Sequence, residues 1–195
     1  MTKHNKSFCA ADLRARILSQ DIAPGSPLDE ATLTAEYNIS RTPLRESLHR
    51  LAGGGYVRLE ENRGAKVESM DFATMRVFFQ TAPLVYCSIA QQAAENRTSR
   101  QVAQLKDIQV AFVAATRAQD TQRAGLMNHD FHELIGEMAQ NPYLLASLKR
   151  MLVDHTRLGQ TFFNPQSAED EARVQKSSEQ HDAMISAIEA QEPSL

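Results

Sequence analysis

Residues 39–51, with the sequence ISRTPLRESLHRL, have the pattern of a helix that is apolar on one side and basic on the other. Ser40 is a favoured N-cap, because its hydroxyl can accept a hydrogen bond from a backbone N–H of the first turn. Pro43 falls within that turn, where its missing N–H costs no hydrogen bond. The apolar side consists of leucines spaced four and three residues apart, namely Leu44, Leu48 and Leu51. The pattern predicts a helix from Arg41 to about Ala52.

The residues on both sides of this segment predict the rest of a small domain. Apolar spacing and turn residues indicate two helices before it and a hairpin after the glycine triplet 53–55. The expected elements are a helix over residues 11–20, a short helix from the N-cap Asp29 through Tyr37, and strands over residues 56–59 and 65–68. Asn38 suits a left-handed conformation that would close the short helix in a tight turn. This order of elements is that of a winged helix-turn-helix.

Two arginines give the outer side of the predicted helix its basic character. Arg41 and Arg45 are four residues apart and therefore share one face, and arginine can address guanine through two hydrogen bonds. Thr42 can contact a phosphate or a thymine methyl group. The alternative is that both arginines simply form the solvated side of a surface helix. The short helix before them and the hairpin after them favour a recognition helix for the DNA major groove.

The sequence from residue 70 onward has only helical patterns. Apolar residues at spacings of three and four predict helices over residues 71–96, 99–118, 121–140, 142–163 and 168–191. The connections between them are short, so neighbouring helices should run antiparallel and form a bundle. We therefore predict a mostly α-helical chain with a winged helix-turn-helix over residues 1–69 and an antiparallel all-helical bundle over residues 70–195.

Composition and charge exclude several classes of protein. The chain of 195 residues is 42% hydrophobic and has no apolar run of membrane-spanning length and no signal-peptide pattern. Cys9 and Cys87 lie far apart without metal-ligand spacing, which favours a reducing compartment, the cytoplasm. Residues 1–68 hold ten Lys and Arg against nine Asp and Glu, and residues 69–195 hold eleven against fifteen. Because neither part is strongly basic, DNA binding must depend on a few well-placed arginines.

The first third of the chain resembles the GntR family of bacterial transcriptional regulators. That family carries the pattern SR-x-P-V-R-E-A-L-x-x-L, then a glycine-rich turn and a wing that ends in R-G. The matching residues are Ser40, Arg41, Pro43, Arg45, Glu46, Leu48, Leu51, Gly55, Arg63, Gly64 and Val67. Two conservative departures, Leu44 and Ser47, interrupt the match.

The resemblance implies a set of contacts with a double-stranded DNA operator. The implied residues are Arg41, Thr42, Arg45, Arg63, Gly64 and Lys66. The first three belong to the recognition helix. Arg63 and Gly64 would form the tip of the wing and approach the minor groove, whose negative potential favours a cation. Lys66 would contact a phosphate, unless it is an ordinary solvated residue of a strand.

The helical part resembles the FCD subgroup of the same family, in which the bundle holds a divalent metal that binds the carboxylate of an organic acid effector. The resemblance lies in the segments NHDFH at 128–132, AQNP at 139–142 and EQH at 179–181. It implies a metal site at Asn128, His132 and His181. Zinc and nickel suit imidazole nitrogens, and a spacing of four places Asn128 and His132 on one helix face.

Two departures from the FCD pattern leave this predicted metal site incomplete. Asn128 stands where the family has an aspartate, and an amide is a neutral and weaker ligand. The family's last histidine lies on a further helix, which this sequence, ending at Leu195, is expected to lack. The alternative is that His132 and His181 are polar residues inside a bundle whose hydrogen bonds satisfy them.

Two residues of the helix at 142–163 are candidates for binding the effector. His155 would line the cavity of the bundle. Arg157 would pair with an acidic effector, unless it forms a surface salt bridge. His129, next to the predicted metal ligands, is expected to face solvent.

Together these features predict a sequence-specific transcriptional regulator whose operator affinity responds to a small-molecule carboxylate, and not an enzyme. One recognition helix reads only a few base pairs, so a homodimer reading two half-sites is expected. A metal-dependent enzyme would rest on His132 and His181 alone, because the sequence has no paired E-x-x-H motifs, nucleophile motif or phosphate loop. A third alternative is a winged helix that binds protein instead of DNA. No membrane partner is expected.

Overall fold

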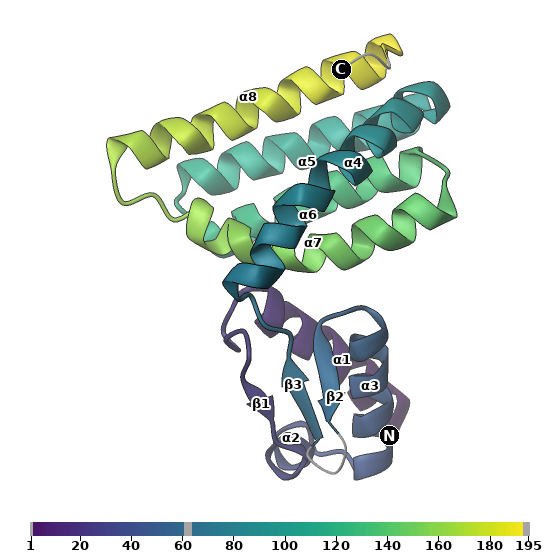
Figure 1. Cartoon of the computed structure of the whole chain (residues 1–195), viewed down its shortest axis with the longest axis vertical. Coiled ribbons are helices and arrows are strands. Elements are labelled where there is room, and N and C mark those ends of the chain that lie inside the picture. The colour runs from purple at the N-terminus through teal and green to yellow at the C-terminus, as the bar shows by residue number, and fades with distance from the viewer. Residues whose placement is uncertain (1, 61–63, 193–195) are drawn as a thin grey trace. The chain divides into compact units, whose positions relative to one another are not determined.

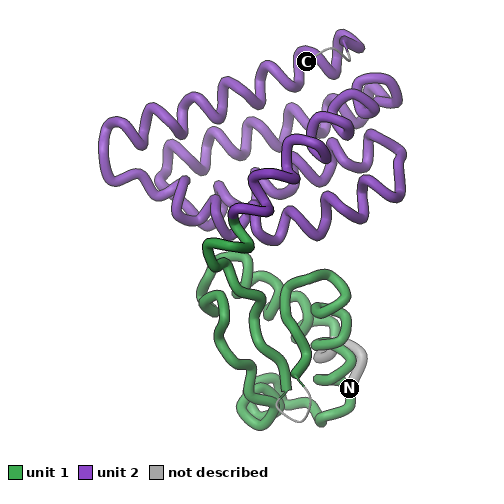
Figure 2. Tube along the Cα trace, in the orientation of Figure 1, with its two compact units in different colours: residues 1–75 green, residues 76–195 purple. Residues whose placement is uncertain are grey.

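The computed structural model describes residues 2–60 and 64–192, and of residues 2–6 only the backbone. The chain divides into two compact units, residues 1–75 and 76–195, which Figure 2 shows in different colours. The described residues form eight helices and one small sheet of three strands. The prediction of a mostly α-helical chain with a winged helix-turn-helix and a helical bundle is confirmed.

The first unit contains three helices and the sheet (Figure 1). The helices are α1 (Thr2–Leu18), α2 (Glu30–Tyr37) and α3 (Arg41–Gly53), and the strands are β1 (Pro27–Leu28), β2 (Val57–Glu60) and β3 (Gly64–Val67). The strand order is β1-β3-β2, and both pairings are antiparallel. Within them Leu28 pairs with Ala65, and Val57 pairs with Val67. The hairpin β2–β3 is the predicted wing, whereas the short strand β1 was not predicted.

Local capping explains the turn between α2 and α3. The Asp29 carboxylate accepts the backbone N–H of Thr32 at 2.7 Å and caps α2. Asn38 ends α2 in the left-handed conformation, at φ 50°. Ser40 precedes α3 with extended backbone, but its side chain makes no capping hydrogen bond. The prediction of α2, the tight turn and α3 therefore agrees with the structure, although Ser40 acts through its backbone conformation.

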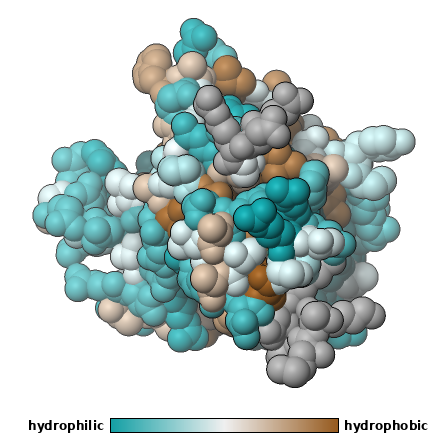
Figure 3. All heavy atoms as spheres, turned by 90° about the horizontal axis from the view of Figure 1, so that it is seen from below, coloured by the Kyte–Doolittle hydropathy of each residue, from teal (hydrophilic) through white to brown (hydrophobic). Residues whose placement is uncertain are grey.

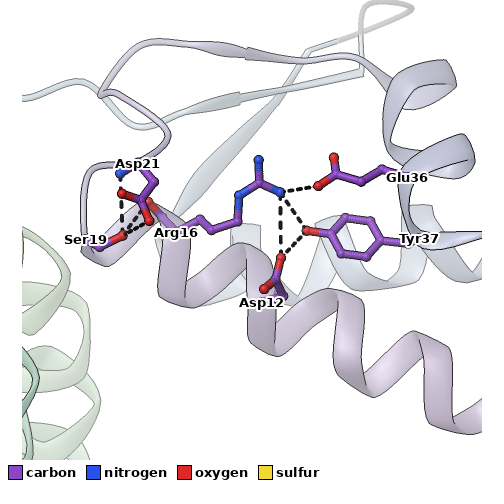
Figure 4. Close-up of polar contacts among 6 residues, drawn as sticks. All are labelled: Asp12, Arg16, Ser19, Asp21, Glu36 and Tyr37. Carbon is purple, nitrogen blue, oxygen red and sulfur yellow. Dashed lines mark hydrogen bonds and ion pairs between the residues drawn. The ribbon is translucent and has the colours of Figure 1, made fainter. Parts of the chain in front are cut away.

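A polar cluster joins α1 to α2 beside the core of the first unit (Figure 4). The Tyr37 hydroxyl donates a hydrogen bond to Asp12 Oδ2 at 2.5 Å and accepts one from Arg16 Nη1 at 3.0 Å. Arg16 Nη1 also lies 2.7 Å from Glu36 Oε1. Burial and the Asp12 carboxylate raise the pKa of Tyr37, so the phenol stays protonated and continues to donate. The apolar core beside this cluster comprises Cys9, Leu13, Ile17, Leu28, Leu33, Tyr37, Leu44, Leu48, Leu51, Val57, Ala65 and Val67.

The second unit is the helical bundle, which contains all but the first turn of α4. Its helices are α4 (Phe72–Asn96), α5 (Ser99–Arg117), α6 (Thr121–Met138), α7 (Pro142–Phe162) and α8 (Ala168–Ala190). The helix α5 packs against α6 and α8, and α6 packs against α7. The main core draws on all five helices and centres on Ile89, Leu105, Phe131, Leu152 and Ile188. Because α6 is covered by α5 on one side and α7 on the other, polar residues of α6 become buried in the bundle.

On the face shown in Figure 3 hydrophilic side chains predominate, and the hydrophobic ones form small separate areas. Among the helices that the structure describes, none is both long enough and apolar enough to span a membrane.

Candidate functional site

The first candidate site is the outward face of α3. Arg41, Thr42 and Arg45 are all exposed. The opposite face packs into the core through Leu44, Leu48 and Leu51, and Ser47 is also buried there. The amphipathic pattern of the sequence therefore presents the predicted DNA-contacting residues to solvent, where a duplex can receive them.

The Arg45 side chain is held by α2. Arg45 Nε lies 2.9 Å from Glu30 Oε1, and Arg45 Nη2 lies 3.1 Å from Glu30 Oε2. These hydrogen bonds raise the pKa of Arg45 above its usual value. The Glu30 carboxylate therefore orients an exposed guanidinium without burying it. Nothing in the sequence pattern of α3 indicated this partner, since Glu30 lies in the first turn of another helix.

The wing has a tight turn on its β3 side. Gly64 adopts φ +81°, and a Cβ added there would lie 3.1 Å from the Leu28 carbonyl oxygen. Both features favour glycine at this position. Lys66 lies partly exposed on β3, next to the pairing residue Pro27. Arg63 lies outside the described residues.

The second candidate site is inside the bundle, where three helices bring histidine rings together. His132 of α6 lies with its ring centroid 5.5 Å from that of His181 of α8. The ring centroid of His155 of α7 lies 4.8 Å from that of His132. Asn128 is buried one turn before His132 on α6. The predicted ligands Asn128, His132 and His181 thus belong to one region, and His155 belongs to it as well.

Hydrogen bonds define which nitrogen of His181 is available. His181 Nδ1 donates to Gln109 Oε1 at 3.0 Å. The orientation of the Gln109 amide is fixed, because its Nε2 donates to the Ser178 carbonyl and to Asp182 Oδ1, each at 3.1 Å. The ring of Phe131 stacks on the ring of His181, and their centroids lie 4.0 Å apart. The proton therefore resides on Nδ1, and Nε2 carries the lone pair.

The rings of His155 and His132 are also neutral, the form in which an imidazole can bind a metal. His155 Nδ1 lies 2.7 Å from the Tyr86 hydroxyl, which leaves Nε2 outside that hydrogen bond. Burial lowers the pKa of His155 and of His181 to about 4, and nearby histidines add to the shift. Burial, together with His155 and His181, also lowers the pKa of His132 well below its usual value. Neutral imidazoles are the form that binds metal.

His129, expected to face solvent, is buried instead, so this expectation is wrong. Its Nδ1 lies 2.7 Å from Thr156 Oγ1, and its Nε2 lies 3.4 Å from Glu133 Oε2. Glu133 also pairs with Lys149 at 2.9 Å. The pKa of Glu133 falls to about 2, chiefly because of the hydrogen bond with His129. With Asp130, these residues form a compact group of ligand-type side chains. Lys149 balances the charge of Glu133, and Thr156 and Glu133 bond both nitrogens of His129, so these contacts account for that pair without a metal.

Arg157 is fully buried, not placed on the surface. It forms an ion pair with Asp154, and Arg150 Nη1 lies 3.3 Å from the other Asp154 oxygen. The alternative of a surface salt bridge is therefore wrong. Nearby, the side-chain nitrogen of Gln160 is buried against Gly125 and has no hydrogen-bond partner in the described part of the chain. Sequence patterns gave no signal for Gln160.

Comparison with known proteins assigns this arrangement to a family. The model of bacterial regulatory proteins of the gntR family matches residues 5–67, and the model of the FCD domain matches residues 84–195. The chain therefore belongs to the gntR-family regulators that carry an FCD domain. This membership agrees with the prediction of a regulator rather than a metal-dependent enzyme.

The sequence identity between this chain and individual relatives is low. The HTH-type transcriptional repressor RspR of Escherichia coli strain K12 is 32% identical over 130 residues, which make up 64% of this chain and only 57% of that protein. The galactonate operon transcriptional repressor of the same strain is 25% identical and is matched over 98% of this chain and 90% of its own length. The structure of E. coli McbR/YncC has a TM-score of 0.79 at 19% identity, and covers 99% of this chain and 89% of its own. At that identity the likeness supports the fold alone.

Proposed function

We propose that this protein is a sequence-specific DNA-binding transcriptional regulator whose operator affinity is controlled by a small carboxylate effector. In this proposal residues 1–69 bind DNA, and residues 70–195 bind the effector and form a homodimer. The observation that carries it is the outward face of α3, on which Arg41, Thr42 and Arg45 are exposed above a leucine core. Such a regulator would meet its operator in the cytoplasm.

The recognition helix would read bases while the wing holds the duplex. Arg41 and Arg45 would address guanines, Thr42 would contact a phosphate or a thymine methyl group, and the wing would supply Arg63, Gly64 and Lys66. Selection from a random duplex pool would give the operator. Gel shifts should then show that Arg45→Ala loses base preference as well as affinity, whereas Arg100→Ala, an exposed arginine of α5, changes neither. An Arg45→Ala variant that binds the operator as selectively as the unchanged protein would contradict this role.

The bundle would hold a divalent metal at His132, His181 and Asn128. The neutral rings and the free Nε2 of His181 support this proposal, since they fit zinc or nickel. A bound metal would supply positive charge for the carboxylate of an effector. Arg157 and His155 would contribute further effector contacts. Metal analysis of the purified protein, followed by thermal melts with a panel of organic acids, tests both parts.

Exposed apolar side chains of α4 support a homodimer. Within the second unit, Val77, Phe79 and Leu84 are 54%, 63% and 71% exposed. Contiguous exposed apolar surface marks sites of protein–protein contact, and Val77 and Leu84, seven residues apart, lie on one face of α4. A dimer would present two recognition helices to two half-sites, and effector binding would change their relative placement. Light scattering during size-exclusion chromatography should give a molar mass twice that of one chain. Leu84→Glu should lower this measured mass towards that of the monomer.

A further inference from the structure

A cavity of about 240 Å³ lies where the end of α5 meets the beginning of α8, two helices that pack against each other (Figure 1). Arg117 of α5 and Glu171 of α8 both line it. We propose that this cavity binds a free α-amino acid with an aliphatic side chain. No sequence motif indicated a site here. It would be additional to the metal and effector site proposed above, and it depends on neither.

Two side chains of opposite charge line this cavity, one from each helix. Arg117 is the last residue of α5, and Glu171 lies in the first turn of α8. Both are exposed, and within the described part of the chain neither forms an ion pair. The two other acidic residues of that turn, Glu169 and Asp170, already pair with Arg173. Arg117 and Glu171 are therefore the charged groups of the cavity that a ligand can engage.

Opposite charges in one cavity select a ligand that itself carries both charges. The carboxylate of an amino acid would accept hydrogen bonds from the guanidinium of Arg117, and its ammonium group would donate to the carboxylate of Glu171. A dicarboxylate would meet the negative charge of Glu171, and a diamine would meet the positive charge of Arg117. Since each of these alternatives leaves like charges opposed, the cavity favours a zwitterion.

The rest of the lining is partly apolar. Val113 of α5, Val174 of α8 and Pro165, in the connection between α7 and α8, contribute to it. The two valines also pack against a small core that includes Phe112 and Phe163. An aliphatic side chain would be stabilised here in proportion to the apolar area removed from water. Pockets for drug-sized ligands measure about 300–1,000 Å³, so a cavity of about 240 Å³ suits a smaller molecule, such as a single amino acid.

The cavity is separate from the histidine rings of the bundle. Ser178, the buried residue of the lining, accepts hydrogen bonds from Gln109 Nε2 at its hydroxyl and at its carbonyl, each at 3.1 Å. Gln109 in turn accepts the Nδ1 proton of His181. None of the residues proposed above for the metal or the effector lines the cavity. An amino acid bound here would therefore lie beside the proposed effector site and not within it.

The test is isothermal titration calorimetry of the full chain with L-leucine as the probe. We expect saturable binding that Arg117→Gln and Glu171→Gln each weaken at least about tenfold, because each removes a hydrogen bond to a charged group. The unchanged protein should show the same loss with isocaproate, which lacks the ammonium group, and with isoamylamine, which lacks the carboxylate. Arg100→Gln and Glu137→Gln, exposed residues of α5 and α6, are the matched controls and should bind L-leucine like the unchanged protein.

Each contrary result has a distinct meaning. If L-leucine, L-valine and L-methionine all failed to bind saturably, the cavity would not be an amino acid site. Isocaproate binding as tight as that of L-leucine would remove the role of Glu171. Binding that both substitutions leave unchanged would overturn the site, and its loss in His132→Gln would then place the amino acid among the histidine rings.

The substituted residues Arg117 and Glu171 are exposed, so the variants should fold, and circular dichroism checks that the bundle is intact. Operator binding and metal binding are measured separately. A failure of the amino acid site therefore leaves the proposed regulator and its metal untouched.

Discussion

The carboxylate of Glu30 in α2 holds the guanidinium of Arg45 in α3 through hydrogen bonds to Nε and to Nη2, at 2.9 and 3.1 Å. Arg45 is still 60% exposed at its side chain. A long side chain that is restrained before binding loses less conformational freedom when it meets a base edge. The same carboxylate also places a negative charge close to where phosphates would lie.

Replacing Glu30 by Gln should therefore affect specific and non-specific DNA binding in opposite directions. Affinity for random duplex should rise, because a negative charge is removed, while the preference for the operator should fall by about tenfold, because Arg45 is no longer fixed. Gel shifts with operator and scrambled duplexes at the same salt concentration measure both quantities. Glu95→Gln, an exposed carboxylate of α4, is the matched control. An unchanged ratio of the two affinities would show that Glu30 does not position Arg45 for recognition.

The cluster of Tyr37, Asp12 and Arg16 should contribute measurably to the stability of the first unit. The Tyr37 hydroxyl has both a carboxylate acceptor and a guanidinium donor. Its removal in Tyr37→Phe should lower the free energy of unfolding by about 1.5–3 kcal/mol, as for other hydrogen bonds to charged groups. Urea unfolding followed by circular dichroism measures the change. Tyr143→Phe, whose side chain is exposed, should leave the unfolding midpoint where it was.

Much of the fold could be predicted because local signals determine helix ends. Asp29 and Asn141 accept backbone N–H groups at helix starts, and Asn38 ends α2 in the left-handed conformation. The predicted boundaries of the bundle helices accordingly lie within two residues of the structure. The helix expected at residues 11–20 begins earlier, at Thr2, since no capping residue marks its start. The strand β1 has two residues, too few for any alternating pattern.

The interior of the candidate effector site was harder to predict, because it depends on which helix faces meet. His129 and Arg157 carry polar groups that by themselves suggest a surface. His129 is buried because α6 and α7 pack so that Thr156 faces it, whereas Arg157 is buried beside Asp154 of its own helix, α7. Spacing along one helix cannot reveal a partner on another helix, such as Thr156, or which face of α7 is covered. For the same reason the contact of Tyr86 with His155 emerged only from the structure.

The buried thiol of Cys9 should resist chemical modification. Burial raises its pKa to about 11, and Asp12 and Glu36 oppose its ionisation further. In the unfolded chain a cysteine ionises near its ordinary pKa of about 8.5. The stability that depends on the neutral thiol is therefore complete below that value and is lost as the pH rises towards 11. In a Cys87→Ser variant, iodoacetamide at pH 8 should label Cys9 far more slowly in the native protein than in urea. Equal rates in the two states would refute the burial of this thiol.

Gln109 should affect metal binding although it would not touch the ion. It accepts the His181 Nδ1 proton and is itself held by Ser178 and Asp182. Gln109→Leu removes that acceptor, so the lone pair is no longer confined to Nε2 and the ring is free to rotate. Co²⁺ affinity should fall by about ten- to hundredfold, the usual effect of losing such a partner. Gln104→Leu, an exposed glutamine of the same helix, should keep the affinity of the unchanged protein. A Gln109→Leu protein that is folded and binds Co²⁺ normally would contradict this role.

Asn128 offers a test in the opposite direction, since a substitution there should improve the site. Asn128 is buried one turn before His132 on α6. Asn128→Asp introduces an anionic oxygen ligand of nearly the same shape, which attracts a divalent cation more strongly than an amide does. We expect Co²⁺ to bind the variant at least about tenfold more tightly at neutral pH. A change of this size matches the loss of metal affinity that follows when a ligand loses its hydrogen-bond partner. Without metal the buried carboxylate is uncompensated, so the EDTA-treated variant should melt at a lower temperature than the unchanged protein, and Co²⁺ should raise that temperature more in the variant. Ser186→Asp, an exposed position of α8, controls for added charge alone. If Asn128→Asp bound Co²⁺ no better than the unchanged protein, Asn128 would have to lie outside the coordination sphere.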